Sequence, residues 1–160
     1  HGPADQMVAG WGVNGVTTLR SGFPLKFATA AKLTNTFGGG SRPNVAYNCE
    51  RLLITPPRSR LGKWFDTGCF SAPPSFTFGT ASRTDPVLRA HGQNNFDMSL
   101  FKNTQVNERF GLQFRAEFFN IFNRVQFGFP GQSVGVSQFG VVSAQANQPR
   151  LVQFALRLLY

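Results

Sequence analysis

The strongest structural signal in this sequence is the stretch Arg109-Phe110-Gly111-Leu112-Gln113-Phe114-Arg115-Ala116-Glu117-Phe118-Phe119. Its apolar residues occupy every second position, with glycine or polar residues between them. This alternation places the two kinds of side chain on opposite faces of a β-strand. A helix over residues 108–123 is the competing interpretation, but at about 100° per residue it would not separate Arg115 and Glu117 from the phenylalanines. We therefore predict a strand over residues 109–120.

Three other segments alternate in the same way, and they predict strands over residues 8–20, 95–106 and 150–160. The link at residues 105–108 is short and predicts a hairpin. Residues 30–93 and 123–149 are rich in Gly and Pro and predict two long irregular loops. If successive strands alternate in direction, both long loops fall at one end and the hairpin at the other. Long loops on one side and short turns on the other are typical of outer-membrane β-barrels.

Length and composition agree with a β-rich domain. The chain has 160 residues, 41% of them hydrophobic and 14% charged, and its 18 Phe argue against disorder. No window approaches 18 consecutive apolar residues, which excludes a transmembrane helix but not a membrane β-barrel. Each alternating segment has about 10 or 11 residues, the length of a tilted membrane strand. A soluble sandwich with its apolar face inside fits the alternation equally well.

The chain is strongly basic, with a formal net charge of +9. An acidic partner such as nucleic acid or anionic lipid is one interpretation, and a scarcity of acidic residues is the other. Because the basic residues are dispersed along the chain, we do not expect nucleic-acid binding. One local cluster contains Arg51, Arg58, Arg60 and Lys63. It is either a contact for lipopolysaccharide phosphates or an ordinary solvated loop.

The cysteines Cys49 and Cys69 are the two in the chain, and with two His they do not make a zinc site. A disulfide between them is favoured over two free thiols and implies an oxidising compartment.

Candidate catalytic motifs are weak. Residues 131–135 match the pattern of a hydrolase nucleophile elbow, but no His follows Ser133. Asp97 and Glu117 can share one face of adjacent strands, where pairing with Arg115 or Arg157 is favoured over acid–base catalysis. We expect no enzymatic activity, no metal and no cofactor.

Two runs of sequence resemble the end of TonB-dependent receptor-like outer-membrane proteins, specifically the Oar-like group with a carboxypeptidase-regulatory-like N-terminal domain. These runs are Asn94-Asn95-Phe96-Asp97-Met98-Ser99-Leu100-Phe101-Lys102-Asn103 and Leu112-Gln113-Phe114-Arg115-Ala116-Glu117-Phe118-Phe119-Asn120-Ile121-Phe122-Asn123. The run from Trp64 to Phe70 resembles an extracellular-loop segment of the group, in which Cys69 would pair with an earlier cysteine. The ending resembles the group's terminal strand, which implies a C-terminal barrel-assembly signal formed by Phe154, Leu156, Leu158 and Tyr160.

The resemblance implies an all-β, antiparallel fold taken from the C-terminal end of an outer-membrane β-barrel. The start at His1, without an initiator Met, suggests a piece of something longer. Four strands cannot close a barrel, so we expect the chain to be incomplete alone and to assemble through open strand edges. Its partners would be the remaining strands of a larger barrel or identical copies, with outer-membrane lipid as a further contact.

Two functions follow from this expectation. In the first, the chain is the C-terminal segment of an outer-membrane receptor barrel whose parent binds and imports a ligand. In the second, it is a released receptor fragment that polymerises into an extracellular β-rich filament or tube.

Overall fold

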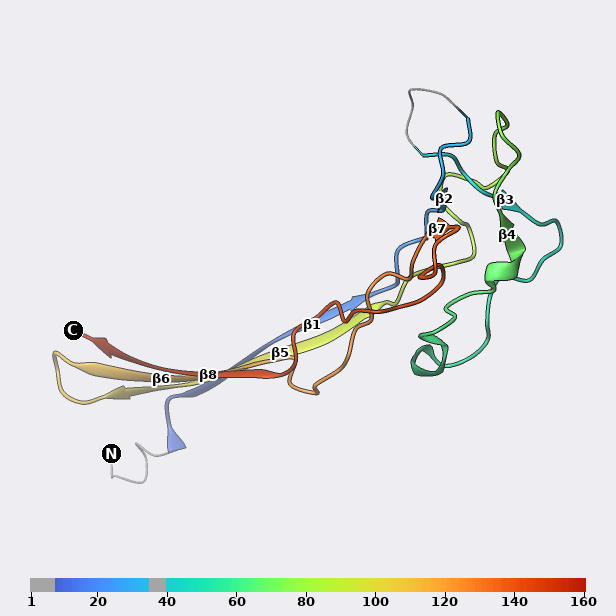
Figure 1. Ribbon diagram of the computed structural model, residues 1–160. Coiled ribbons are helices and arrows are strands. Elements are labelled where there is room, and N and C mark those ends of the chain that lie inside the picture. Colours follow the sequence, from blue (N-terminus) through green and yellow to red (C-terminus); the bar gives the residue numbers. More distant parts are fainter. Residues whose placement is uncertain (1–7, 35–39) are drawn as a thin grey trace. The chain divides into compact units, whose positions relative to one another are not determined.

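The main structural element is a four-stranded antiparallel sheet. The computed structural model describes residues 8–34 and 40–160, so the start at His1 and residues 35–39 of the first predicted loop lie outside the described residues. The sheet consists of β1 (Trp11–Arg20), β5 (Gln93–Gln105), β6 (Gly111–Phe119) and β8 (Leu151–Leu159). The strands are hydrogen-bonded in the order β1-β5-β6-β8 (Figure 1). They overlap the four ranges in which the sequence alternates, and the fold is all-β and antiparallel as predicted.

The strand register sorts the side chains of this sheet onto two faces. Val13 pairs with Leu100, Leu100 with Ala116, and Ala116 with Phe154, and the register is unbroken on either side of this row. Residues that pair directly share a face, and each strand alternates between faces. We call the face that carries this row the apolar face. Its large apolar side chains are Trp11, Val13, Leu19, Phe96, Met98, Leu100, Leu112, Phe114, Phe118, Val152, Phe154, Leu156 and Leu158.

The opposite face, which we call the polar face, carries most of the charge of the sheet. Its polar and charged side chains are Asn14, Thr18, Arg20, Gln93, Asn95, Asp97, Ser99, Asn103, Gln105, Gln113, Arg115, Glu117, Gln153 and Arg157. The strands also place Phe101 and Phe119 here, and the Phe101 ring lies in the space that a side chain at Gly12 would need. A glycine covered by a ring from the neighbouring strand is a known way of stabilising a sheet at a residue without a side chain.

The turn between β5 and β6 explains why the hairpin closes where it does. The backbone N–H of Val106 donates to the carbonyl of Phe110, at 2.9 Å. The side-chain oxygen of Asn107 accepts from the backbone N–H groups of Arg109 and Phe110, at 2.9 and 2.8 Å. Asparagine favours turns because its side chain can bond to the backbone in this way. The chain therefore reverses over residues 106–110, close to the predicted link at 105–108.

The sheet is open at both edges. Within the described residues, β1 and β8 each pair with one strand and not with each other. Each edge therefore presents a row of backbone N–H and C=O groups without a strand partner. No helix in the described part of the chain is long and apolar enough to cross a membrane.

The two predicted loops do not remain separate. Residues 21–92 and 126–146 form a second compact unit with its own core, which the sequence did not reveal. Its regular elements are short: β2 (Ala28–Thr29) pairs in parallel with β7 (Ser133–Val134), and β3 (Asn44–Val45) pairs antiparallel with β4 (Phe70–Ser71). Two 3₁₀ helices, η1 (Pro57–Arg60) and η2 (Thr67–Cys69), complete it. The buried core consists of Leu25, Phe27, Trp64, Phe65, Cys69, Phe70, Leu88 and Val142.

Asn120 fixes the exit of the chain from β6. It is buried and adopts the left-handed conformation, with φ at 51°. Its side-chain amide donates to the carbonyls of Arg124 and Gln148, at 3.0 and 3.1 Å, and its side-chain oxygen accepts from the backbone N–H of Arg124. Its own backbone N–H donates to Asp97, at 2.8 Å. One side chain thus joins the turn after β6 to the segment that leads into β8.

We predict that Asn120→Ala lowers the free energy of unfolding by about 2–4 kcal/mol. The substitution removes the side-chain hydrogen bonds to Arg124 and Gln148, and it replaces an asparagine, which tolerates the left-handed region, with an alanine, which does not. Urea titration of the full chain in detergent micelles, followed by far-UV circular dichroism, measures the change. Asn120→Gly is the matched control, because it removes the hydrogen bonds but tolerates the backbone angle, and should cost about 1 kcal/mol less. A loss below about 0.5 kcal/mol for the alanine variant would contradict this role of Asn120.

Candidate functional site

The apolar face of β8 is unusually exposed for a strand rich in large apolar residues. Phe154, Leu156 and Leu158 are 67%, 68% and 57% exposed, and Tyr160 follows the strand. The first three are the predicted assembly-signal residues that lie within the strand, and they share one face. Phe154 stacks on Phe114 of β6, with ring centroids 6.2 Å apart. A contiguous apolar surface of this kind marks a site that contacts lipid or another protein surface.

The polar face holds the two carboxylates that the sequence places on adjacent strands. Glu117 forms an ion pair with Arg115, at 3.5 Å, as expected. Asp97 instead accepts from the side chain of Asn95, at 2.9 Å, and from the backbone of Asn120. Both carboxylates line a shallow hollow of about 150 Å³ on this face. Each carboxylate is engaged by donors of the sheet or of the turn that follows β6, so the geometry gives them a structural role.

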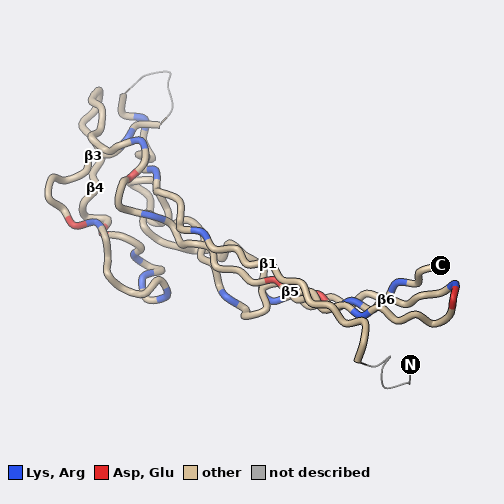
Figure 2. Tube along the Cα trace, turned by 180° about the vertical axis from the view of Figure 1, so that it is seen from behind, with Lys and Arg blue, Asp and Glu red and all other residues tan. Residues whose placement is uncertain are grey.

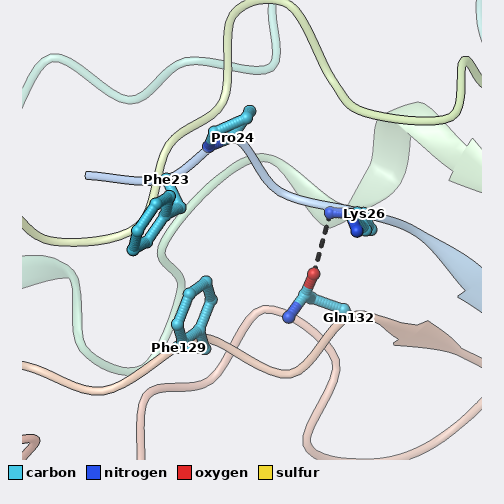
Figure 3. Close-up of a pocket in the computed structure, with 5 residues that line it drawn as sticks. All are labelled: Phe23, Pro24, Lys26, Phe129 and Gln132. Carbon is cyan, nitrogen blue, oxygen red and sulfur yellow. Dashed lines mark hydrogen bonds between the residues drawn. The ribbon is translucent and has the colours of Figure 1, made fainter. Parts of the chain in front are cut away.

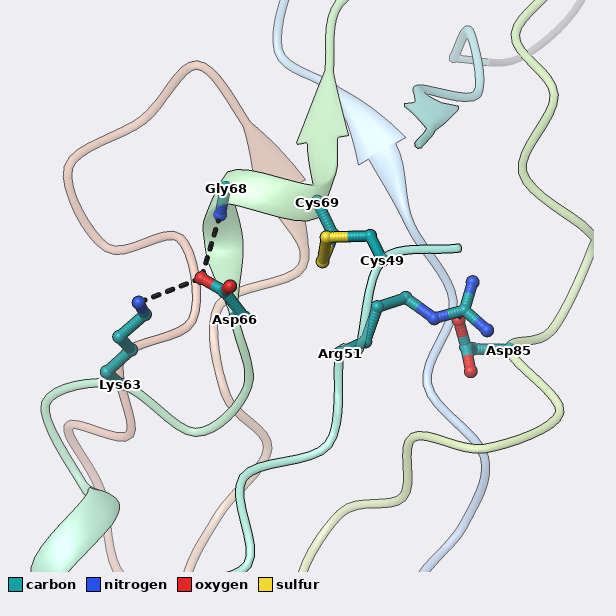
Figure 4. The surroundings of a disulfide bond; sticks show 7 residues. All are labelled: Cys49, Arg51, Lys63, Asp66, Gly68, Cys69 and Asp85. Atoms are coloured by element: carbon teal, nitrogen blue, oxygen red, sulfur yellow. Dashed lines mark hydrogen bonds and ion pairs between the residues drawn. A yellow bond between two sulfur atoms is a disulfide. The ribbon is translucent and has the colours of Figure 1, made fainter. Parts of the chain in front are cut away.

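The two cysteines form the disulfide that the sequence predicts. Cys49 and Cys69 are bonded, with their Cα atoms 5.6 Å apart, and Cys69 is buried in the core of the second unit (Figure 4). The bond closes a loop that includes η1, η2 and two core aromatics, Trp64 and Phe65. Closing a loop of this length stabilises the folded state by about 3 kcal/mol through the entropy of the unfolded chain. The cross-link therefore compensates for the scarcity of regular secondary structure here.

The four basic residues of the predicted lipid contact do not form one open patch. Figure 4 shows Arg51 and Lys63 on opposite sides of the disulfide. Arg51 pairs with the buried carboxylate of Asp85 at 3.4 Å, and Lys63 pairs with Asp66 at 2.8 Å. The hydrogen bond from Lys63 lowers the pKa of the Asp66 carboxyl, and a second bond from the Gly68 backbone adds to this effect.

The remaining two basic residues lie in η1. The guanidinium of Arg60 lies 4.4 Å from the centre of the Trp64 ring and donates to the carbonyl of Leu53 at 2.7 Å. Arg58 is exposed and has no ion pair among the described residues. Figure 2 shows Lys and Arg dispersed along the chain, with few Asp and Glu. Of the four, Arg58 keeps its charge available at the surface.

His91 lies in an aromatic environment that the sequence did not predict. Its ring packs edgewise against Phe127 and Trp64, with centroids 5.0 and 6.3 Å away. Burial lowers the pKa of this imidazole, and the positive charge of Arg60 lowers it further, whereas a hydrogen bond with the Gly92 backbone opposes both effects. The sequence does not indicate these contacts, because Trp64 and Phe127 are both far from His91 along the chain.

Comparison with known proteins identifies the chain at the level of the family. The model of a family described as outer membrane beta barrel domain matches residues 1–153. No curated protein and no solved structure matches the chain significantly.

We predict that the imidazole of His91 titrates below the usual value of about 6.5. Because the unfolded chain binds the proton more readily, stability is fully present above about pH 6.5 and falls as the pH drops from there. NMR titration of the imidazole in the full chain measures the pKa, with His1→Gln used to assign the two histidine signals. Arg60→Gln should raise the pKa of His91, whereas Arg58→Gln in the same 3₁₀ helix should leave it unchanged. A pKa at or above 6.5 in the wild-type chain would contradict the burial argument.

Proposed function

The chain belongs to a family of outer membrane β-barrel domains, and on this premise we propose that its sheet is a membrane-embedded part of a larger, TonB-dependent receptor-like barrel. The observation that carries the proposal is the division of the sheet into an apolar and a polar face. In a barrel of the outer membrane, the apolar face contacts lipid and the polar face lines the lumen. The family places the protein in the outer membrane, which supports a lipid-facing orientation of the apolar face.

The dimensions of the strands fit this orientation. The strands β1, β5, β6 and β8 have 10, 13, 9 and 9 residues. At about 3.3 Å per residue and a tilt of about 45°, these strands project to about 21–30 Å across the membrane, a range that includes the apolar band of about 25 Å. A soluble sandwich would instead cover the apolar face with a second layer. Val13 and Leu156, on the two edge strands, are more than 60% exposed, which favours lipid as the missing cover.

The open edges favour a barrel with more strands than these four. In lipid each backbone group without a hydrogen-bond partner costs several kcal/mol, and about eight strands are needed to close a barrel. We propose that β1 and β8 pair with neighbouring strands of the same barrel. In this proposal, residues Phe154, Leu156, Leu158 and Tyr160 form the surface read by the barrel-assembly machinery.

The finer identity rests on the resemblance of the two runs in β5 and β6 to Oar-like receptors. By this resemblance the parent barrel binds and imports a ligand, and the chain has no enzymatic role. The disulfide-closed second unit then lies on the extracellular side, where oxidising conditions keep the bond intact. There, the exposed guanidinium of Arg58 is the basic residue of its cluster best placed to contact lipopolysaccharide phosphate.

A second candidate function draws on the same open edges. Copies of the chain could pair β1 to β8 and form an extracellular filament or tube, with the apolar faces buried against neighbouring copies. This arrangement needs no other strands. In the filament the apolar face makes no contact with lipid, whereas in the proposed receptor barrel it does.

We predict that neighbouring residues of β8 differ in accessibility when the full chain is assembled in lipid bilayers. A spin label at Leu156→Cys, on the apolar face, should collide preferentially with oxygen, which concentrates in the hydrocarbon layer. A label at Ala155→Cys, on the polar face, should collide preferentially with a water-soluble nickel complex. The native disulfide leaves no other thiol to react. Equal accessibility at the two positions would refute membrane insertion of this face.

We predict that native material carrying this sequence occurs in outer membranes and in a polypeptide much larger than 17.6 kDa. An antibody against the second unit, used on fractionated membranes and on detergent-free extracts, makes the measurement. Regular fibres built from a 17.6 kDa chain, seen by electron microscopy of the detergent-free extract, would instead establish the filament function.

A further inference from the structure

The second unit contains a pocket of about 440 Å³ (Figure 3). It is lined by Phe23, Pro24, Lys26, Phe129 and Gln132. This volume lies in the range of pockets that hold small organic molecules. Neither the barrel sheet nor the disulfide involves these residues, so the proposed function leaves the pocket without a role.

The pocket is formed by two segments that are distant in sequence and held side by side. Residues 28 and 29 pair in parallel with residues 133 and 134. The backbone N–H of Ala28 donates to the carbonyl of Gln132 at 3.1 Å. The backbone N–H of Lys26 donates to the side-chain oxygen of Gln132 at 2.8 Å, and Figure 3 shows the nitrogen of this amide turned away from Lys26. Residues 131–135, rejected above as a nucleophile elbow, thus include one wall of the pocket.

Both phenylalanine-bearing segments are anchored on their other sides. Next to Phe23, the backbone N–H of Leu25 donates to the carbonyl of Leu88, and that of Ala90 donates to the carbonyl of Phe23, at 3.0 and 2.9 Å. Next to Phe129, Pro130 is fully buried, and the backbone N–H of Gly131 donates to the carbonyl of Val141. A pocket on such a fixed backbone loses little conformational entropy when a ligand binds.

The two rings are held at the surface, although the unit has an aromatic core. Phe23 and Phe129 are 51% and 54% exposed, whereas Phe27, Phe65 and Phe70 pack together in the buried cluster. Rings presented this way offer large, rigid apolar surfaces on which a flat ligand can stack.

The polar groups of the pocket are donors with no acidic partner. Among the described residues, no carboxylate lies within ion-pair distance of Lys26, and none lines the pocket. Gln132 uses its side-chain oxygen for the Lys26 backbone, which leaves its N–H₂ group to donate. An ammonium and an amide N–H₂ group beside two aromatic rings are complementary to a ligand that combines a negative charge with a flat, apolar ring system.

We propose that this pocket binds a small molecule with a planar ring system that bears a carboxylate. The ring lies against Phe23 and Phe129, and the carboxylate accepts from the Lys26 ammonium and the Gln132 amide. A ligand with a neutral ring system lacks the attraction to the ammonium, and a ligand with a saturated ring cannot stack on the two phenylalanines. This binding is independent of import and of barrel closure, so it can hold or fail regardless of the proposed function.

The test uses 2-naphthoate and the full chain assembled in lipid nanodiscs. NMR follows the backbone amide of Lys26 and the side-chain amide of Gln132, two neighbouring reporters at the pocket. Both signals should shift saturably with 2-naphthoate. They should shift far less with 2-naphthalenemethanol, which lacks the charge, and with cyclohexanecarboxylate, which lacks the planar ring.

Two substitutions with matched controls separate the contributions of the aromatic ring and of the ammonium to ligand binding. Phe129→Leu and Lys26→Gln should each raise the dissociation constant for 2-naphthoate about threefold to tenfold. Phe78→Leu and Lys32→Gln change residues of the same unit that are also exposed but lie outside the pocket, and they should leave the dissociation constant unchanged. Because Phe129 and Lys26 lie at the surface, neither change disturbs the core. Equal binding of the three probes, or no difference between pocket and control variants, would overturn the proposal.

Discussion

The register of β1, β5, β6 and β8 is the constraint on which the rest of the structure depends. Side chains alternate with a period of two, so a slip of one residue in any strand exchanges its two faces. A slip of β6 alone would bring Arg115 and Glu117 to the side that carries Leu100 and Phe154. In a bilayer, a single arginine on the lipid face near the midplane costs about 2–4 kcal/mol. Because the two faces differ in polarity, a change of register is unfavourable. The asparagine turns at residues 107 and 120 also fix the two ends of β6.

The second unit is an ordered structure although it contains few residues in helices or strands. Fixing the backbone of each residue costs about 1–2 kcal/mol of conformational entropy, and the hydrogen bonds of two-residue strands offset little of this cost. The unit relies instead on a disulfide, on an aromatic cluster, and on polar groups that organise turns. Asp85 is an example: its buried carboxylate accepts from the backbone N–H groups of Val87 and Leu88 and pairs with Arg51. The backbone bonds order a local turn, and the ion pair with Arg51 joins that turn to a segment far away in the sequence.

The difference between the two units also explains what the sequence could predict. Alternation is local, so the four strands, their two faces and the hairpin between β5 and β6 could be predicted from runs such as Arg109 to Phe119. The disulfide could be predicted because two cysteines allow one pairing. The core of the second unit could not be predicted from the sequence, because Phe27, Trp64 and Val142 come together only in three dimensions. The hydrogen bond from Asn120 to Gln148 and the parallel pairing that forms the pocket are equally non-local. The four basic residues are close together in the sequence, but acidic or aromatic partners engage Arg51, Lys63 and Arg60, and Arg58 alone of the four remains exposed without an ion pair among the described residues.

The cations on the apolar side of the sheet give a final argument for a membrane setting. Lys102 is the charged residue of the apolar face within the four strands, and its ammonium lies 5.0 Å from the centre of the Trp11 ring. Toward the other end of β5, the guanidinium of Arg124 lies over Phe96 and Phe122, at 5.6 and 5.8 Å. Cations supported by aromatic rings are stable where hydrocarbon meets headgroups, because the ring shields the stem while the charge reaches water. Between these two pairs, the apolar face of β5 carries Met98 and Leu100, and Lys102 itself lies in one row with Phe114 and Leu156. Their aromatic partners allow both cations to remain on an otherwise apolar face, which agrees with the proposed contact of that face with lipid.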